Sequence, residues 1–500
     1  MTAAARATPV PAPPPAGRAQ AEVQRLLADW LGRADAPPCL WLETRLPAPA
    51  ADPNPQPQWW QRLDTEQGIY RTLVVRDGIH HLHSLGLLTR AYARLADGGW
   101  LLLLSAFNLD NFQDGYDGLP SRERLLAQAQ RCGFELEQEA RLDELLRDDL
   151  QRSPAAAQRA AELEAYRSGR RGYRLLCLRK GAAPRWRVAE LREADFPAVA
   201  ALFQAVFGQP MSAELWRWKY GGGRGSNVVA WAGGRLIAHY GSLSRRIAYF
   251  GRPQWACQIG DVMVEAHERG VLTRQGPFFL TAASQAEMVI GPHHIGFGFP
   301  NGRALKVGAR LGLYTQVGSV CEVSWTPLAT RPALWQRLRP LHGGQREQVR
   351  RAGDRLWTAM AADLGEAIVG IRDGAWLLHR YLDHPHQRYQ LWLLSNRLSG
   401  RPLGLLVLRQ QGERCELLDL VAPLARLPAL VLAARRLAAA WGASGLHCWI
   451  SSGFAHLFEA CGGQAQALDI GVPNSCWVPG PPAERLRDRW WLMAGDTDFL

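Results

Sequence analysis

Strand-like and helix-like segments alternate along nearly the whole chain, and this alternation limits the fold more than any single motif does. The apolar run YRTLVVRDGIHHL (70–82) is followed by an amphipathic segment (84–99) that begins with Ser, a common helix N-cap, and ends with Gly-Gly. The next segment, WLLLLSAF (100–107), is apolar enough for a strand that is buried on both faces. The pattern therefore predicts an α/β fold that starts with a partial doubly wound (Rossmann-like), mostly parallel sheet.

Five hundred residues exceed what one hydrophobic core usually supports, so we expect several domains. Near the C-terminus, GAWLLHRYLDHP (374–385) resembles the earlier ELWRWKYGGG (214–223), which indicates two copies of a domain-sized arrangement. The expected parts are a disordered Ala/Pro-rich tail (1–20), an N-terminal α/β domain (21–181), a first mixed α/β domain (185–325), a basic linker (326–351) and a second mixed α/β domain (352–500).

The net charge of +12 at pH 7 raises the question of nucleic-acid binding, because clustered cations release counterions from phosphates. Only three of the 58 basic residues are lysines, however, and the arginines are spread over every segment. This skew is typical of coding bias in a GC-rich bacterial genome. We therefore expect a solvated basic surface and no nucleic-acid partner.

The nine cysteines are far apart and include no C-x-x-C pair, so the sequence predicts neither a zinc site nor a disulfide framework. Such cysteine usage is typical of the cytoplasm. The histidines of HHLH (80–83) have no acidic or Cys partner at ligand spacing, so we expect no bound metal. No apolar run approaches the roughly 20 residues of a membrane-spanning helix, and the N-terminus lacks the apolar core of a secretory signal. We expect a soluble cytoplasmic protein without a membrane partner.

The predicted element order of residues 185–325 resembles the GNAT superfamily of acyl-CoA-dependent N-acyltransferases. IGDVMVEAHERGVLTRQGPFFL (259–280) stands where that family has a strand, a loop with the pattern R/Q-x-x-G-x-G/A and a helix. The resemblance implies that acetyl-CoA or another acyl-CoA binds at this loop, since the N–H groups at a helix N-terminus suit a pyrophosphate. Leu272 stands at one glycine position of the pattern, and an ordinary strand-to-helix turn is the alternative interpretation. The residues that the resemblance places at the cofactor are Met263, Val264, Arg269, Gly270, Val271, Arg274 and Asn301.

Acyl transfer to an amine also needs a general base and a donor to the oxyanion. The resemblance gives the N–H of Met263 or Val264 as the oxyanion donor. Glu265 and Asp261 are the candidates for the base, because period two places both side chains on one face of the strand; Glu265 could equally be a solvated loop carboxylate. In the family a helix tyrosine protonates the leaving thiolate. Gly308 takes its place here, so either another acid replaces it or the thiolate leaves without one. Tyr314 is the candidate for that acid and could equally be a core aromatic residue.

Two further stretches have two interpretations each. The aromatic residues of WRWKY (216–220) could line an acceptor pocket or close a core. Residues 70–180 resemble the second half of a class I S-adenosylmethionine-dependent methyltransferase, from the acidic strand end through LADGG to CGF. The segment before them (37–60) has no glycine where those enzymes have a glycine-rich loop, so we expect a degenerate domain without bound S-adenosylmethionine.

The sequence thus favours an N-acyltransferase that acts on a primary amine of a small molecule through its first GNAT-like domain. In the second copy, LVAPLARLP (420–428) has no glycine after the strand, so that copy is expected to be non-catalytic. A ligand-binding scaffold built from degenerate domains is the alternative function. A tRNA-dependent aminoacyl transferase is a third. The acceptor and the oligomeric state are left open.

Overall fold

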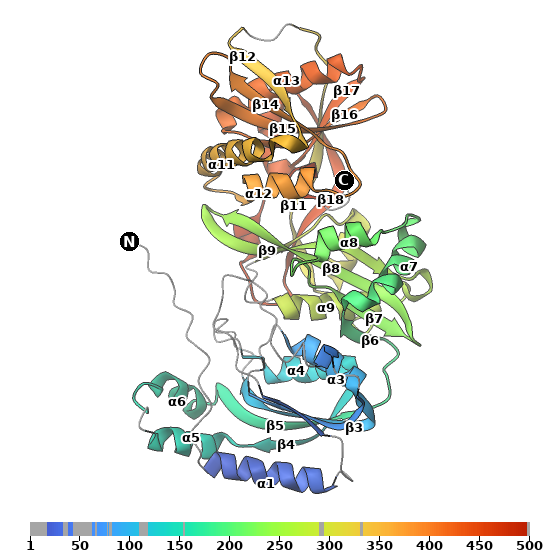
Figure 1. Ribbon diagram of the computed structural model, residues 1–500, viewed down its shortest axis with the longest axis vertical. Coiled ribbons are helices and arrows are strands. Elements are labelled where there is room, and N and C mark those ends of the chain that lie inside the picture. The colour runs from blue at the N-terminus through green and yellow to red at the C-terminus, as the bar shows by residue number, and fades with distance from the viewer. Residues whose placement is uncertain are drawn as a thin grey trace. The chain divides into compact units, whose positions relative to one another are not determined.

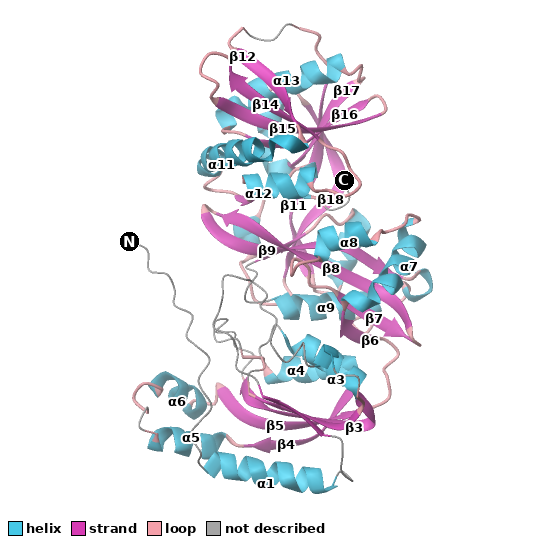
Figure 2. Cartoon of the chain, viewed as in Figure 1, coloured by secondary structure: helices cyan, strands magenta, loops and turns pink. Residues whose placement is uncertain are grey.

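The computed structural model describes residues 18–33, 39–43, 63–65, 68–77, 79, 83–109, 119–153, 156–289, 295–330 and 334–497. Residues 1–17 of the predicted tail lie outside these ranges. The chain forms two compact units (Figure 1): unit 1 contains Met1–Gly208, Ser226–Tyr240 and Val262–Pro292, and unit 2 contains Gln209–Gly225, Gly241–Asp261 and His293–Leu500. The mixture of helices and mixed sheets in Figure 2 confirms the predicted α/β class.

Unit 1 begins with a five-stranded sheet in the order β1-β2-β3-β5-β4. The first three strands are parallel. β5 pairs antiparallel with β3, and β4 pairs antiparallel with β5. The strands are β1 (Cys39–Glu43), β2 (Tyr70–Arg76), β3 (Leu95–Asn108), β4 (Phe134–Arg141) and β5 (Arg171–Lys180).

Both faces of this sheet are covered by helices, as the apolar run of β3 predicts (Figure 1). Leu101 and Leu103 pack on one face with α3 (Ser84–Arg94) and α4 (Arg122–Cys132). Leu102 and Leu104 pack on the other face, which is covered by α1 (Arg18–Arg33), α5 (Asp143–Arg152) and α6 (Ala160–Arg167).

The rest of unit 1 consists of parts of the first predicted mixed domain (185–325). An antiparallel set runs from β6 (Arg187–Glu190) through β7 (Val228–Ala232) to the start of β8 (Arg235–Tyr249), with the helices α7 (Phe196–Phe207) and α9 (Pro277–Val289). Arg131 of α4 forms an ion pair of 2.9 Å with Glu287 of α9, and Arg90 of α3 forms one of 2.9 Å with Glu190 of β6. Residues on the two sides of the boundary that we expected near 181–185 therefore belong to one compact unit.

In unit 2, the end of β8 pairs antiparallel with β13 (Ile368–Gly370), and β13 pairs parallel with β19 (Trp490–Trp491). The strand β9 (Arg252–Val264) pairs parallel with β10 (Ile295–Phe297) only from Ala256 to Gln258. Beyond Gln258, β9 continues without β10 and crosses from unit 2 into unit 1 after Asp261. The helices α8 (Ala213–Tyr220) and α10 (Gly302–Arg310) also belong to unit 2.

The second sheet of unit 2 has the order β12-β14-β15-β16-β17-β11-β18. Its strands are β11 (Tyr314–Trp325), β12 (Gln336–Leu341), β14 (Gln390–Asn396), β15 (Pro402–Gln411), β16 (Arg414–Val421), β17 (Gly445–Ser451) and β18 (Gln464–Ser475). The helices of this part are α11 (Arg346–Asp363), α12 (Gly374–Leu377), α13 (Leu427–Ala440), α14 (Ala455–Glu459) and α15 (Ala483–Leu486).

The two predicted mixed domains exchange strands. β11, which we expected to close the first domain, lies between β17 and β18 of the second. In return, β13 and β19 of the second predicted domain extend from β8 of the first. The expected linker (326–351) contains β12 and the first turn of α11, because residues 336–341 pair with β14. Alternating apolar residues identify a strand but not the sheet to which it belongs, so this exchange could not be predicted from the sequence.

Candidate functional site

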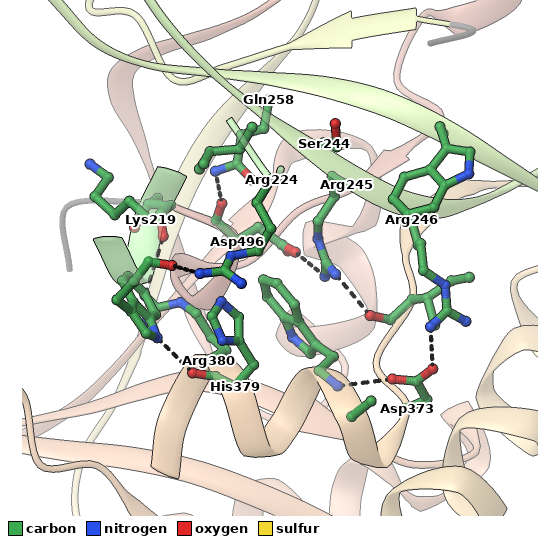
Figure 3. A pocket seen from close by; sticks show the side chains of 17 residues that line it. Lys219, Arg224, Ser244, Arg245, Arg246, Gln258, Asp373, His379, Arg380 and Asp496 are labelled. Atoms are coloured by element: carbon green, nitrogen blue, oxygen red, sulfur yellow. Dashed lines mark hydrogen bonds and ion pairs between the residues drawn. The ribbon is translucent and has the colours of Figure 1, made fainter. Parts of the chain in front are cut away.

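A cavity of about 250 Å³ lies within unit 2 (Figure 3). Its apolar walls include the rings of Trp218, Trp255 and Trp376. Its charged side chains come from α8, the turn after it, β8 and the segment around α12, together with Asp496 near the C-terminus. They comprise two carboxylates and five cations: Asp373, Asp496, Lys219, Arg224, Arg245, Arg246 and Arg380. An apolar pocket with a few convergent polar groups is the usual form of a small-molecule site.

Asp261, one of the two predicted bases, is held by residues of α8. Its side chain is 7% exposed and accepts hydrogen bonds of 2.6 Å from Lys219 Nζ and of 2.6 Å from the Tyr220 hydroxyl. Its backbone has φ of 47°, a left-handed conformation that interrupts the regular alternation of side chains along β9. The carboxylate therefore anchors α8 to β9, and the ion pair with Lys219 favours its charged form.

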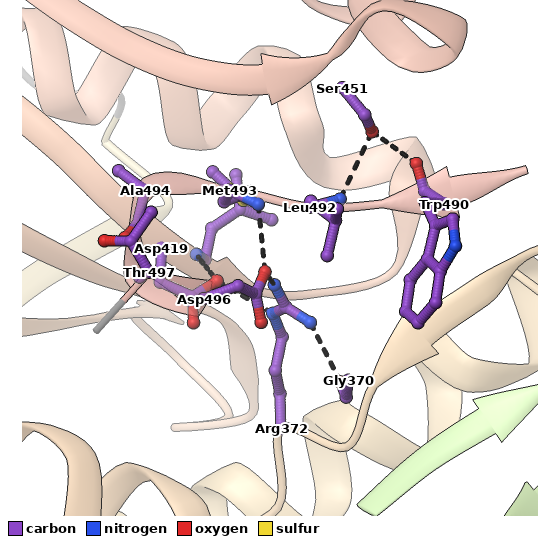
Figure 4. A network of polar contacts seen from close by, with 12 residues as sticks. Gly370, Arg372, Asp419, Ser451, Trp490, Leu492, Met493, Ala494, Asp496 and Thr497 are labelled. Carbon is purple, nitrogen blue, oxygen red and sulfur yellow. Dashed lines mark hydrogen bonds and ion pairs between the residues drawn. The ribbon is translucent and has the colours of Figure 1, made fainter. Parts of the chain in front are cut away.

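A buried ionic network adjoins the cavity (Figure 4). The Arg372 guanidinium, fully buried, donates to Asp419 at 2.8 Å and to Asp496, and both carboxylates are also buried. The Tyr381 hydroxyl donates to Asp419 at 2.7 Å, and the backbone N–H of Met493 donates to Asp496 at 2.9 Å. Asp496 therefore connects this network to the cavity that it lines.

His379 is the titratable group in the cavity that is held neutral near pH 7. Burial, reinforced by the charge of Arg224, lowers the pKa of its imidazole to about 4. Its ring stacks on Trp218 with 5.2 Å between ring centres, and its backbone carbonyl accepts a hydrogen bond of 2.9 Å from the Trp218 indole. Nearby, His384 also has a pKa lowered to about 4, mainly by burial. Its Nδ1 accepts a hydrogen bond of 2.9 Å from the N–H of Gln387.

Because the pKa values of His379 and His384 are lowered in the folded protein, we expect the protein to lose stability in mild acid. In the unfolded chain they bind protons near pH 6.5, whereas in the folded protein they bind them only near pH 4. Their contribution is thus present above pH 6.5 and is lost as the pH falls toward 4. Both rings are partly exposed, so solvent screening reduces the effect of the full shifts, and we expect the free energy of unfolding to fall by at least about 2 kcal/mol over this range because of these groups.

The measurement is urea-induced unfolding at a series of pH values in the wild type and in the double variant His379→Gln/His384→Gln. The difference between the two pH profiles isolates the histidines from the carboxylates, which titrate in both proteins. Equal slopes in the wild type and the variant between pH 6.5 and 4 would contradict the prediction.

The loop that follows β9 lies in unit 1, and several of its backbone N–H groups donate no hydrogen bond to a described residue. A short 3₁₀ turn (Ala266–Glu268) follows the strand, and the Arg269 Nε donates to the Val264 carbonyl at 2.7 Å. The backbone N–H groups of Gly270, Val271 and Thr273 donate no hydrogen bond within the described part of the chain. Helix α9 begins at Pro277, six residues after Val271. The loop offers several amide donors before a helix N-terminus, an arrangement that suits an anion.

Gly276 closes this loop because no side chain fits there. A Cβ atom at this position would overlap with the carbonyl oxygen of Val271, and the Gly276 N–H donates to Thr273 at 3.0 Å. Leu272, at one of the glycine positions of the family pattern, has 54% of its surface exposed, so its side chain does not fill the loop. Arg274, at the other glycine position, is also exposed.

Three further residues proposed for the site from the sequence, Met263, Val264 and Glu265, lie at the end of β9 or directly after it. Glu265 accepts from Arg235 at 2.8 Å, and its second carboxylate oxygen is buried without a hydrogen-bond partner in the described structure. Met263 is buried in the core of unit 1 with Val199 and Leu202, and Val264 ends β9 as expected.

Asn301 and Tyr314 lie in unit 2. The Asn301 side chain caps α10 by accepting from the N–H of Ala304 at 2.9 Å. The Tyr314 ring occupies the space next to Gly308, where a Cβ atom would overlap with it. Its hydroxyl donates to the Ala304 carbonyl at 3.3 Å, and burial raises its pKa to about 12. An aromatic residue of β11 thus covers the helix position at which the family has its tyrosine.

Within the described residues, no three His, Cys, Asp or Glu side chains are grouped so that they could hold a metal ion, and His80 and His81 of the HHLH motif lie outside those residues. No described helix is long and apolar enough to cross a membrane.

Known proteins match part of this chain. Residues 187–288 match a family model, the acetyltransferase (GNAT) domain. The matched segment runs from the start of β6 to the last turn of α9, and so includes the loop after β9. No curated protein matches the chain.

Several solved structures are similar to the chain. A probable N-acyltransferase from Enterococcus faecalis V583 has 13% identity and a TM-score of 0.47, and the match covers 58% of this chain and 73% of that one. A GCN5-related N-acetyltransferase from Kribbella flavida has 16% identity and a TM-score of 0.43, with 58% and 70% covered. N-myristoyltransferase from Saccharomyces cerevisiae, solved with bound myristoyl-CoA, has 9% identity and a TM-score of 0.41, with 60% and 81% covered.

Sequence reasoning found part of the cavity and missed the rest. Trp218 and Lys219 of WRWKY line it, whereas Trp216 and Tyr220 of the same stretch are buried. Arg224, His379 and Asp496 were not singled out, although the repeated helix motif contains His379. The signal that could have found His379 is its place in the second copy of the motif. Asp496 belongs to none of the motifs that the sequence shows, so it could not be identified in advance.

Proposed function

We propose that the protein is an N-acyltransferase that transfers an acyl group from coenzyme A to a primary amine of a small molecule. The observation that carries this proposal is the loop after β9, which lies inside the segment that matches the GNAT family model. Its amides at Gly270, Val271 and Thr273 donate no hydrogen bond to any described residue.

The residues of this loop fit an acyl-CoA. The amides of Gly270, Val271 and Thr273 would donate to the pyrophosphate, and Arg269 and Arg274 would add positive charge beside it. The backbone N–H of Met263 or Val264, at the end of β9, is our candidate donor to the thioester oxygen. When bound, acetyl-CoA or another acyl-CoA would supply a thioester carbonyl carbon that an uncharged amine can attack.

The cavity of unit 2 is our candidate site for the acceptor amine. Its cations disfavour a second positive charge, which lowers the pKa of a bound ammonium and favours the free amine that acyl transfer needs. The neutral His379 ring can accept a hydrogen bond from that amine. Asp261 positions α8 beside the cavity. Glu265, in unit 1, remains our candidate general base among the residues of β9 and its loop.

The test is release of free thiol from acetyl-CoA and longer acyl-CoAs in the presence of a panel of primary amines, with the full-length protein. We expect thiol release that depends on the amine and a product whose mass has grown by one acyl group. A protein that is stabilised by acyl-CoA but releases no thiol with any amine would instead be the ligand-binding scaffold. A protein that acyl-CoA does not stabilise would contradict both.

A further inference from the structure

The cavity of unit 2 carries more positive than negative charge. Lys219, Arg245 and Arg246 are each paired with a carboxylate, at 2.6 Å to Asp261, 3.4 Å to Asp496 and 2.9 Å to Asp373. Arg224 lines the same cavity and forms no ion pair within the described part of the chain. Arg224 is half-buried, and a partly desolvated cation without a carboxylate partner is stabilised by a bound anion.

Arg224 is held in place by carbonyl oxygens at the C-terminal end of α8, not by any described carboxylate. Its Nη2 donates to the carbonyl oxygens of Arg217 at 2.9 Å and of Trp218 at 3.0 Å. Its Nε is buried and donates to no described group. Burial lowers the pKa of this guanidinium, which shows that the surroundings disfavour the charge instead of balancing it. The two carbonyls fix the orientation of the Arg224 guanidinium and leave its Nε available as a donor.

Arg245 supplies a second oriented donor. Its side chain is 5% exposed, its Nε is buried without a partner in the described structure, and its guanidinium lies 3.2 Å from the centre of the Trp376 ring. Figure 3 shows both guanidinium groups in the pocket, together with the His379 ring. Two oriented guanidinium groups beside indole rings suit a ligand that joins a planar anion, such as a carboxylate, to an apolar group.

We propose that the acceptor amine carries a carboxylate and an apolar body, as an aromatic amino acid does. Arg224 and Arg245 bind the carboxylate, and Trp218, Trp255 and Trp376 bind the apolar part. This assignment rests on the proposed function in that it takes the cavity as the acceptor site. A cavity of about 250 Å³ is at the small end of ligand pockets, which matches a compact acceptor.

The test compares ligands that differ only in the carboxylate. Calorimetry on the full-length protein, without acyl-CoA, measures the binding of L-phenylalanine against phenethylamine and of L-tryptophan against tryptamine. We expect each amino acid to bind at least about tenfold more tightly than its partner, the usual contribution of hydrogen bonds to a charged group. Arg224→Gln should remove most of this difference. The matched control is Arg435→Gln, since Arg435 also donates to a backbone carbonyl but does not line the cavity.

Equal affinities within each pair, or no binding of any of the four compounds at millimolar concentration, would overturn the proposal. So would an Arg224→Gln variant that loses affinity for acetyl-CoA and keeps the preference for amino acids, because the anion would then belong to the cofactor. Binding of acetyl-CoA is measured in a separate titration. Its failure beside intact amino-acid binding would contradict the acyltransferase function and leave the carboxylate site standing.

Discussion

Replacing Arg372 by methionine is expected to lower the free energy of unfolding by about 3–5 kcal/mol. The guanidinium is fully buried between Asp419 and Asp496, and its removal leaves Asp419 without a cation and Asp496 with only the longer pair to Arg245 among the described residues. Methionine has a similar length, so the loss reports the charge more than the packing. The measurement is thermal and denaturant-induced unfolding of the variant and the wild type.

Two comparisons make this prediction specific. Arg351→Met removes an arginine whose side chain is 78% exposed and pairs only with Glu347, and we expect a change within about 0.5 kcal/mol. Asp419→Asn in the Arg372→Met background should recover part of the loss, because one of the stranded charges is gone. An Arg372→Met variant as stable as Arg351→Met would show that the network contributes nothing to the fold.

Replacing Gly276 by alanine is expected to weaken acetyl-CoA binding at least about tenfold, a loss of the order of one charge-assisted hydrogen bond. The new methyl group would overlap with the Val271 carbonyl, so the loop must open to admit it. That movement displaces the amides of Val271 and Thr273 from the arrangement that would hold the pyrophosphate. Isothermal titration with acetyl-CoA measures the loss.

The matched control is Gly343→Ala. A Cβ atom at Gly343 meets no atom within 4 Å, and this position is not in the loop, so the affinity should be unchanged. Unfolding midpoints of both variants separate a local effect on the loop from a general loss of stability. If Gly276→Ala binds acetyl-CoA like the wild type, the loop does not hold the cofactor.

Local patterns predicted the elements better than their partners. The apolar run around Leu101–Leu104 correctly indicated a strand buried on both faces, because both faces of a covered sheet must be apolar. The same reasoning identified β11 as a strand but assigned it to the wrong sheet. Strand exchange depends on which long-range pairings bury most surface, and periodicity holds no information about them.

The candidate site divides in the same way. The loop at Arg269–Gly276 could be located from the order of elements around it and from its two glycines, of which Gly276 has no room for a side chain. The cavity brings together Arg224, His379 and Asp496, which are far apart in the sequence and have ordinary neighbours. The interruption at Asp261 was also out of reach, since a single left-handed residue in a strand leaves no mark on an apolar pattern.

The most direct test of the account is hydrogen–deuterium exchange of the full-length protein with and without saturating acetyl-CoA. The amides of Gly270, Val271 and Thr273 have no partner in the described structure and should exchange rapidly in the free protein. Acetyl-CoA is expected to slow exchange in peptides that cover residues 266–280. Slower exchange only around residues 420–428, the corresponding turn of the second copy, or no change anywhere, would contradict the claim that this loop binds an acyl-CoA.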